Sequence, residues 1–179
     1  MVTSNKWLLL LCTTLIAFWL SMCSKTPKEI AIQPFGEIDT AHVHSVEQAL
    51  ESYYGLEVTV LKHTPLPENA FTEIRKPRYR ADTLIAWLRD NKPNRYDYVI
   101  GLTDQDISIT KWKDKTAGIV KDPEWKYKDF GIFGLGYRPG PTCIVSTFRL
   151  AKGKNGKKKF QERLRKISCH EIGHNFGLP

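Results

Sequence analysis

Between residues 28 and 61 the hydrophobic pattern changes from strand-like to helical and back again. Residues 28–34 (KEIAIQP) alternate apolar and polar side chains, which predicts a strand. Residues 41–54 place apolar side chains at helical spacing, and Gly55 follows in a position suited to a helix C-cap. Residues 56–61 (LEVTVL) are β-branched with period two and predict a second strand. Strand, helix and strand at this spacing indicate a right-handed βαβ unit with parallel strands.

The remainder of the chain predicts two more helices and three more extended segments. The helices are expected over residues 81–90 and 160–176, and the extended segments over residues 96–102, 131–137 and 143–150. Between them lie a proline-rich loop crossing (62–80), a charged and turn-rich segment (103–129) and a basic loop (152–159). The predicted fold class is therefore α/β, with a mixed, mostly parallel twisted sheet of about five strands and three helices.

Residues 1–23 predict an export signal. Lys6 precedes the apolar run of residues 7–20 (WLLLLCTTLIAFWL), whose fourteen residues would extend about 21 Å as a helix, short of the ~30 Å core of a bilayer. The following Leu-Ser-Met-Cys box resembles a bacterial lipoprotein signal, and the resemblance implies cleavage before Cys23 and lipidation of its thiol. The protein would then be anchored by its lipid to a membrane of the bacterial cell envelope. A short uncleaved anchor, or a secretory signal cut nearby, is the alternative.

Composition and charge narrow the classes of partner. At 179 residues, with 41% hydrophobic and 26% charged residues, the chain is expected to form one globular unit over residues 24–179. The net charge of +8 is concentrated in residues 111–128 and 152–166. Such segments are either solvated faces or a patch for phospholipid headgroups, polysaccharide or acidic peptides. No paired-cysteine finger or aromatic RNA-binding signature accompanies them, so no nucleic-acid partner is expected.

The four cysteines predict no pattern of disulfide bonds. Cys12 lies inside the predicted signal and Cys23 is the predicted lipid site, which leaves Cys143 and Cys169. Two buried thiols are expected, with a disulfide between them as the alternative in an exported protein.

Residues 170–177 (HEIGHNFG) carry the candidate chemistry. His170 and His174 are four residues apart, so a helix places both imidazoles on one face, where they can bind the same zinc ion. Glu171 is rotated about 100° from His170, beside the metal, where a general base for a metal-activated water must stand. Gly177 tolerates a positive φ and lets the helix end in a sharp turn. The motif predicts a zinc-dependent peptidase acting on peptides or proteins.

His-Glu-x-x-His-x-x-Gly is also the opening of the metzincin zinc motif, and HEIGHNFGLP resembles the archaemetzincin branch. The resemblance implies a third histidine three residues after Gly177, at position 180, followed by the Met-turn and four cysteines for a second, structural zinc. We therefore expect residues 24–179 to be the N-terminal part of a catalytic domain whose C-terminal subdomain is missing, and this chain alone to have little activity. The resemblance also makes residues 143–150 the candidate strand for binding extended substrate.

Two other interpretations compete with this one. A thermolysin-type zincin would take its third ligand from a glutamate on a later helix, and Gly177 argues against it. A basic surface lipoprotein could bind polyanions and carry the motif without catalysis. The remaining histidines, His42, His44 and His63, are expected in surface or capping roles.

Overall fold

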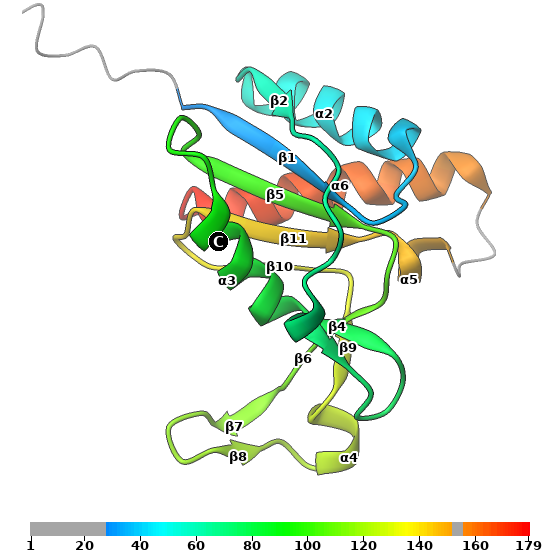
Figure 1. The fold of residues 1–179 in the computed structure, drawn as a ribbon, viewed down its shortest axis with the longest axis vertical. Helices are drawn as coiled ribbons and strands as arrows, with labels where there is room; N and C mark the ends of the chain where they lie inside the picture. Colours follow the sequence, from blue (N-terminus) through cyan, green and yellow to red (C-terminus); the bar gives the residue numbers. More distant parts are fainter. Residues whose placement is uncertain (1–27, 152–155) are drawn as a thin grey trace, which may run out of the picture.

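A computed structural model describes residues 28–151 and 156–179, so the predicted signal with Cys23 lies outside the described residues (Figure 1). The central sheet has five strands in the order β10-β11-β5-β1-β2. They are β1 (Ile30–Phe35), β2 (Val58–Val60), β5 (Tyr98–Thr103), β10 (Gly134–Gly136) and β11 (Thr142–Ser146). Four run parallel, and β10 is antiparallel to β11. The predicted mixed, mostly parallel sheet is confirmed.

Three long helices accompany this sheet, as the sequence predicted. They are α2 (Thr40–Tyr54), α3 (Ala81–Asn91) and α6 (Lys157–Asn175). Helix α2 begins where the Asp39 side chain accepts a hydrogen bond from the Ala41 amide, and it ends at Gly55, whose φ is 65°. Within the described ranges, no helix combines the length and apolar character needed to cross a membrane.

Alternating strand residues build a separate core on each face of the sheet. In β11, Cys143 and Val145 pack in the cluster formed with α2 and α6, whereas Ile144 packs in the cluster formed with α3. Figure 1 shows α3 on one face of the sheet, with α2 and α6 on the other. Helix α6 packs against β10, β11 and β5, and its Leu164 and Ile172 are buried there.

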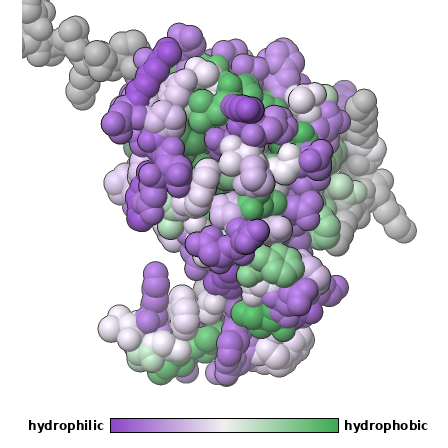
Figure 2. All heavy atoms as spheres, viewed as in Figure 1, coloured by the Kyte–Doolittle hydropathy of each residue, from purple (hydrophilic) through white to green (hydrophobic). Residues whose placement is uncertain are grey.

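A second, four-stranded sheet lies beside the first. Its order is β3-β4-β6-β9, formed by β3 (Phe71–Thr72), β4 (Arg78–Arg80), β6 (Ile107–Ile109) and β9 (Phe130–Ile132). Beyond it project a hairpin of β7 (Trp112–Asp114) and β8 (Ile119–Val120) and the short helix α4 (Glu124–Tyr127). Figure 2 shows hydrophilic side chains over most of the visible surface, with hydrophobic groups between them in both the main body and this lower lobe.

Buried ion pairs hold the second sheet together. The Arg78 guanidinium lies 2.9 Å from the Asp106 carboxylate and 3.1 Å from that of Asp129, and all three side chains are buried. Arg149, on the short helix α5 (Phe148–Ala151), approaches Asp106 to 2.7 Å. Because α5 follows β11 with only Thr147 between them, this network joins the second sheet to the end of the central sheet.

Several sequence-based boundaries are wrong. The loop expected over residues 62–80 contains a 3₁₀ turn (Glu68–Ala70) as well as β3 and β4, which are too short to show a periodicity of their own. The single segment expected over residues 131–137 is divided between β9 and β10, which belong to different sheets. The strand expected over residues 143–150 ends at Ser146 and gives way to α5. Strand β11 is also internal, so it has no free edge for substrate; the edge strand on that side is β10.

Candidate metal centre

The C-terminal end of α6 brings the two motif histidines together. The ring centroids of His170 and His174 are 4.3 Å apart, at an interplanar angle of 68°. His170 is exposed and His174 is half-buried. The adjacency follows from the helical turn, because residues i and i+4 lie one above the other on the same face.

The end of the helix orients His174. Gly177 adopts a φ of 90°, its amide donates to the carbonyl of His174 (2.9 Å), and the amide of Leu178 donates to the carbonyl of Gly173 (2.9 Å). This is the Schellman arrangement of a helix C-terminus. The turn returns the Leu178 carbonyl to the His174 ring, where it accepts a hydrogen bond from Nδ1 at 3.2 Å. With the proton on Nδ1, Nε2 keeps its lone pair for a metal.

Glu171 points away from water and against strand β10. Its residue is only 8% exposed. Burial raises the pKa of the Glu171 carboxyl to about 7, and the charge of His174 and a hydrogen bond from the Gly136 backbone oppose the rise. The carboxyl therefore stands one residue from a candidate metal ligand, in a site from which the fold has removed most water.

Asn175 fastens the end of the motif helix to the central sheet. The residue is 1% exposed, and its side-chain amide donates to the carbonyls of Tyr137 (3.1 Å) and Thr142 (3.0 Å), which flank the β10–β11 connection. The sequence placed Asn175 inside the motif but assigned it no task. Its role depends on a strand connection that is distant in the chain, so the local pattern held no signal for it.

On the opposite side, α2 supports the same helix. The Tyr54 hydroxyl donates to the Cys169 carbonyl at 2.7 Å, and the Tyr54 ring packs edge-to-face against Phe176. Burial is the main cause that raises the pKa of Tyr54 to about 12. Cys143 and Cys169 are free thiols, as expected, but only Cys143 is buried as predicted, and Cys169 is partly exposed. Burial raises the pKa of the Cys143 thiol well above its usual range.

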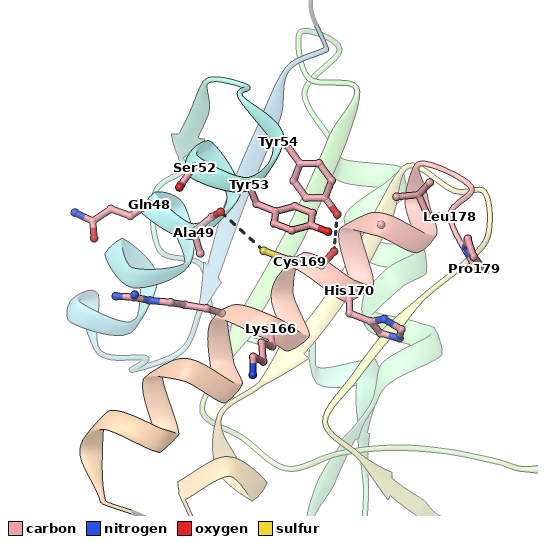
Figure 3. A pocket seen from close by; sticks show the side chains of 12 residues that line it. Gln48, Ala49, Ser52, Tyr53, Tyr54, Lys166, Cys169, His170, Leu178 and Pro179 are labelled. Atoms are coloured by element: carbon pink, nitrogen blue, oxygen red, sulfur yellow. Dashed lines mark hydrogen bonds between the residues drawn. The ribbon is translucent and has the colours of Figure 1, made fainter.

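A pocket of about 840 Å³ opens between α2 and α6 beside the motif. Its lining includes Tyr53, Tyr54, Lys166 and Leu178, and Figure 3 shows the His170 ring at one end of it. The pocket lies on the opposite side of α6 from the buried Glu171 carboxyl, which contacts β10. It is a surface feature next to the candidate metal ligands.

The other histidines take surface roles. His42 packs against the Phe160 ring at 4.7 Å, His44 lies 2.8 Å from the Glu47 carboxylate, and the His63 ring is 3.3 Å from the Gly36 carbonyl.

The donors present fit part of a zinc site. Within residues 28–151 and 156–179, no group of three or more His, Cys, Asp or Glu side chains could hold a metal. Two adjacent imidazoles, one with its tautomer set by a backbone carbonyl, have the chemistry of zinc ligands, and a catalytic zinc uses three protein ligands. His170 and His174 would supply two of them. A His-Glu-x-x-His helix packed against a mostly parallel sheet is typical of the zinc metallopeptidases.

Comparison with known proteins gives the family. Archaemetzincin of Haloquadratum walsbyi (strain DSM 16790 / HBSQ001) is 30% identical over 156 residues, which span 83% of this chain and 79% of that protein. The crystal structure of archaemetzincin from Methanopyrus kandleri superposes with a TM-score of 0.65 at 29% identity, covering 87% of this chain and 76% of the other. A zinc-dependent peptidase from Methanocorpusculum labreanum (strain Z) shares the fold, with a TM-score of 0.60 at 20% identity over 83% and 81% of the two chains. No family model matches the chain. The chain belongs to the archaemetzincin family.

Proposed function

We propose that the protein hydrolyses peptide bonds with a zinc ion for which His170 and His174 supply two of the three protein ligands, and with Glu171 as the general base. The main support is a single stretch of helix that pairs two imidazoles, 4.3 Å between ring centroids, with a buried carboxyl one residue away. The relative from Methanocorpusculum labreanum is itself called a zinc-dependent peptidase, which agrees with this assignment.

Zinc bound there would supply Lewis acidity, which lowers the pKa of a water towards ~7 and polarises a substrate carbonyl. The residues of the chain divide the remaining tasks. His174 presents Nε2 because Nδ1 donates to Leu178, and His170 presents its ring from the solvent side. Glu171 accepts a proton from water and returns it to the leaving amine. Its buried position keeps the carboxyl next to the ligands and limits competition from bulk water.

Strand β10 is the element we propose for binding the substrate. It forms one edge of the central sheet, and its residues contact Glu171. An extended peptide can add to such an edge through backbone hydrogen bonds. This assignment replaces the one made for residues 143–150, because β11 is covered by β10 on one side and β5 on the other.

Two measurements on the full-length protein test the assignment. Glu171→Gln removes the base while keeping its shape, so we expect kcat for peptide cleavage to fall by roughly 10²–10⁴-fold with zinc content unchanged. His174→Ala is expected to lose the zinc, and His44→Ala, an exposed histidine of α2, serves as the matched control and should keep both properties. Wild-type cleavage by the Glu171 variant would disprove the general base. Full zinc content in the His174 variant would disprove the metal assignment.

We also propose, from the sequence of residues 1–23 alone, that the protein is exported and lipidated at Cys23. Metabolic labelling with a fatty-acid analogue should mark the wild type and leave Cys23→Ser unmarked. If the wild type stays unlabelled and membrane association survives the substitution, the lipid anchor is refuted.

A further inference from the structure

The Glu171 carboxyl rests against bare backbone on β10. A Cβ atom placed on Gly134 would lie 2.9 Å from both Cγ and Oε1 of Glu171 and 3.1 Å from its Cδ. Ordinary contacts of a Cβ begin at 3.4 Å, so any side chain at this position would push the carboxyl away from the strand. The absence of a side chain at position 134 is therefore what allows the carboxyl to occupy its place.

Gly136 meets the same residue at a different point. A Cβ there would lie 2.6 Å from the Glu171 backbone carbonyl oxygen and 3.3 Å from Oε2. The backbone of Gly136 also hydrogen-bonds the carboxylate. Position 136 thus sets how closely α6 approaches the strand, and position 134 sets where the carboxyl can lie. Leu135, between them, packs into the cluster on the α3 side of the sheet.

We propose that Gly134 and Gly136 are positioning residues that form a slot in the edge strand and hold the Glu171 carboxyl in its working position. The inference rests on the proposed role of Glu171 and adds the residues that aim it. The two glycines differ in what they contact. At position 134 the three atoms nearest to a methyl group all belong to the Glu171 side chain, whereas at position 136 the nearest atom is the backbone carbonyl oxygen of Glu171, which cannot rotate away. Gly134 therefore sets the position of the carboxyl without affecting the packing of α6, whereas Gly136 sets both the position of the carboxyl and the distance between α6 and the strand.

The decisive variant is Gly134→Ala in the full-length enzyme. We expect kcat to fall by at least about tenfold, with KM, zinc content and melting temperature close to wild type, since a misplaced catalytic group slows chemistry without weakening binding. Added to Glu171→Ala, the same substitution should cause no further loss, because its target is already absent. Gly156→Ala is the matched control: a Cβ on that glycine would have no neighbour within 4 Å, and its φ of −48° is ordinary, so activity should be unchanged.

A second readout does not depend on activity or zinc. Because the Gly136 backbone hydrogen-bonds the Glu171 carboxyl, we expect its amide to exchange faster with solvent in Gly134→Ala and to approach the rate in Glu171→Ala. Glu171→Asp shortens the side chain and leaves the sequence of β10 unchanged, so it should also speed the exchange of the Gly136 amide. This variant provides the test if Gly134→Ala does not fold.

The outcomes separate the two hypotheses. Wild-type kcat in Gly134→Ala, or Gly136 exchange unchanged in both Gly134→Ala and Glu171→Asp, overturns the slot. A further loss when Gly134→Ala is added to Glu171→Ala also overturns it, because the glycine would then act by another route. If Glu171→Ala keeps full activity, the proposed function fails, while the exchange experiment still decides whether the slot holds the carboxyl.

Discussion

Replacing Asn175 with alanine should loosen the attachment of the motif helix to the sheet. The substitution removes two hydrogen bonds, of 3.1 and 3.0 Å, and leaves two carbonyl oxygens without this donor in a region where Asn175 is 1% exposed. A typical hydrogen bond contributes about 0.5–1.5 kcal/mol to stability. Two of them predict a loss of about 1–3 kcal/mol in the free energy of unfolding. For a chain of this size, each kcal/mol corresponds to roughly 2–4 °C in melting temperature.

The companion variant Asn175→Asp sharpens the test because it keeps the shape of the side chain. An ionised aspartate would present only acceptors to the carbonyls of Tyr137 and Thr142, so we expect a larger loss than for alanine at neutral pH. Part of that loss should be recovered in acid, where the protonated carboxyl regains one donor. The folded protein favours the neutral form of this buried aspartate, so we expect its pKa to be higher in the folded than in the unfolded state. The stability of the variant should therefore fall as the pH rises.

Urea denaturation followed by circular dichroism measures these differences, and Asn91→Ala is the matched control. Asn91 also donates from its side-chain amide to a backbone carbonyl, that of Trp87 at 2.9 Å, but it is exposed at the end of α3. Its loss should cost no more than about 0.5 kcal/mol. If Asn175→Ala is as mild as Asn91→Ala, or if the aspartate variant is more stable than the alanine variant at neutral pH, the two hydrogen bonds do not carry the attachment.

Three further predictions concern the surroundings of the site. Asp106→Ala leaves two arginines without their shared buried carboxylate, and it should lower the free energy of unfolding by about 3–5 kcal/mol in a denaturation experiment. The control Asp90→Ala removes an exposed ion pair and should lower it by less than about 1 kcal/mol. Equal losses in the two variants would contradict the role of the buried network. The Tyr54 phenol should ionise with a pKa of about 12, so its contribution to the free energy of unfolding is complete below pH 10 and is lost as the pH rises through 12. An ultraviolet titration of the wild type and Tyr54→Phe identifies the tyrosine that ionises. If the substitution removes a tyrosine that ionises near pH 10, the prediction is wrong. Cys143 should resist alkylation in the folded protein while Cys169 reacts, as mapped by peptide mass spectrometry, and the opposite order would be inconsistent with their burial.

Local sequence was sufficient to predict the long helices and the adjacency of the two motif histidines on one of them. Apolar spacing predicted α2, α3 and α6 to within a few residues, because helical periodicity depends on side chains three and four positions apart. The same geometry required His170 and His174 to be neighbours on any helix that included both. Gly55, with a φ of 65°, marked the end of α2 for an equally local reason.

Only the tertiary structure decided which strands meet and what is buried between them. The place of β10 at the sheet edge depends on pairing with β11, and β4 belongs to a sheet because it pairs with β6, which follows only after α3 and β5 in the chain. The burial of Glu171 depends in turn on β10, since a carboxyl on a helix surface remains in water until another element covers it. The sequence predicted an extended segment over residues 131–137, and only the packed fold shows that the space beside Gly134 and Gly136 is filled by the Glu171 carboxyl of α6. Periodicity along the chain reports which side of an element is apolar, but it contains no information about the element that will pack against that side.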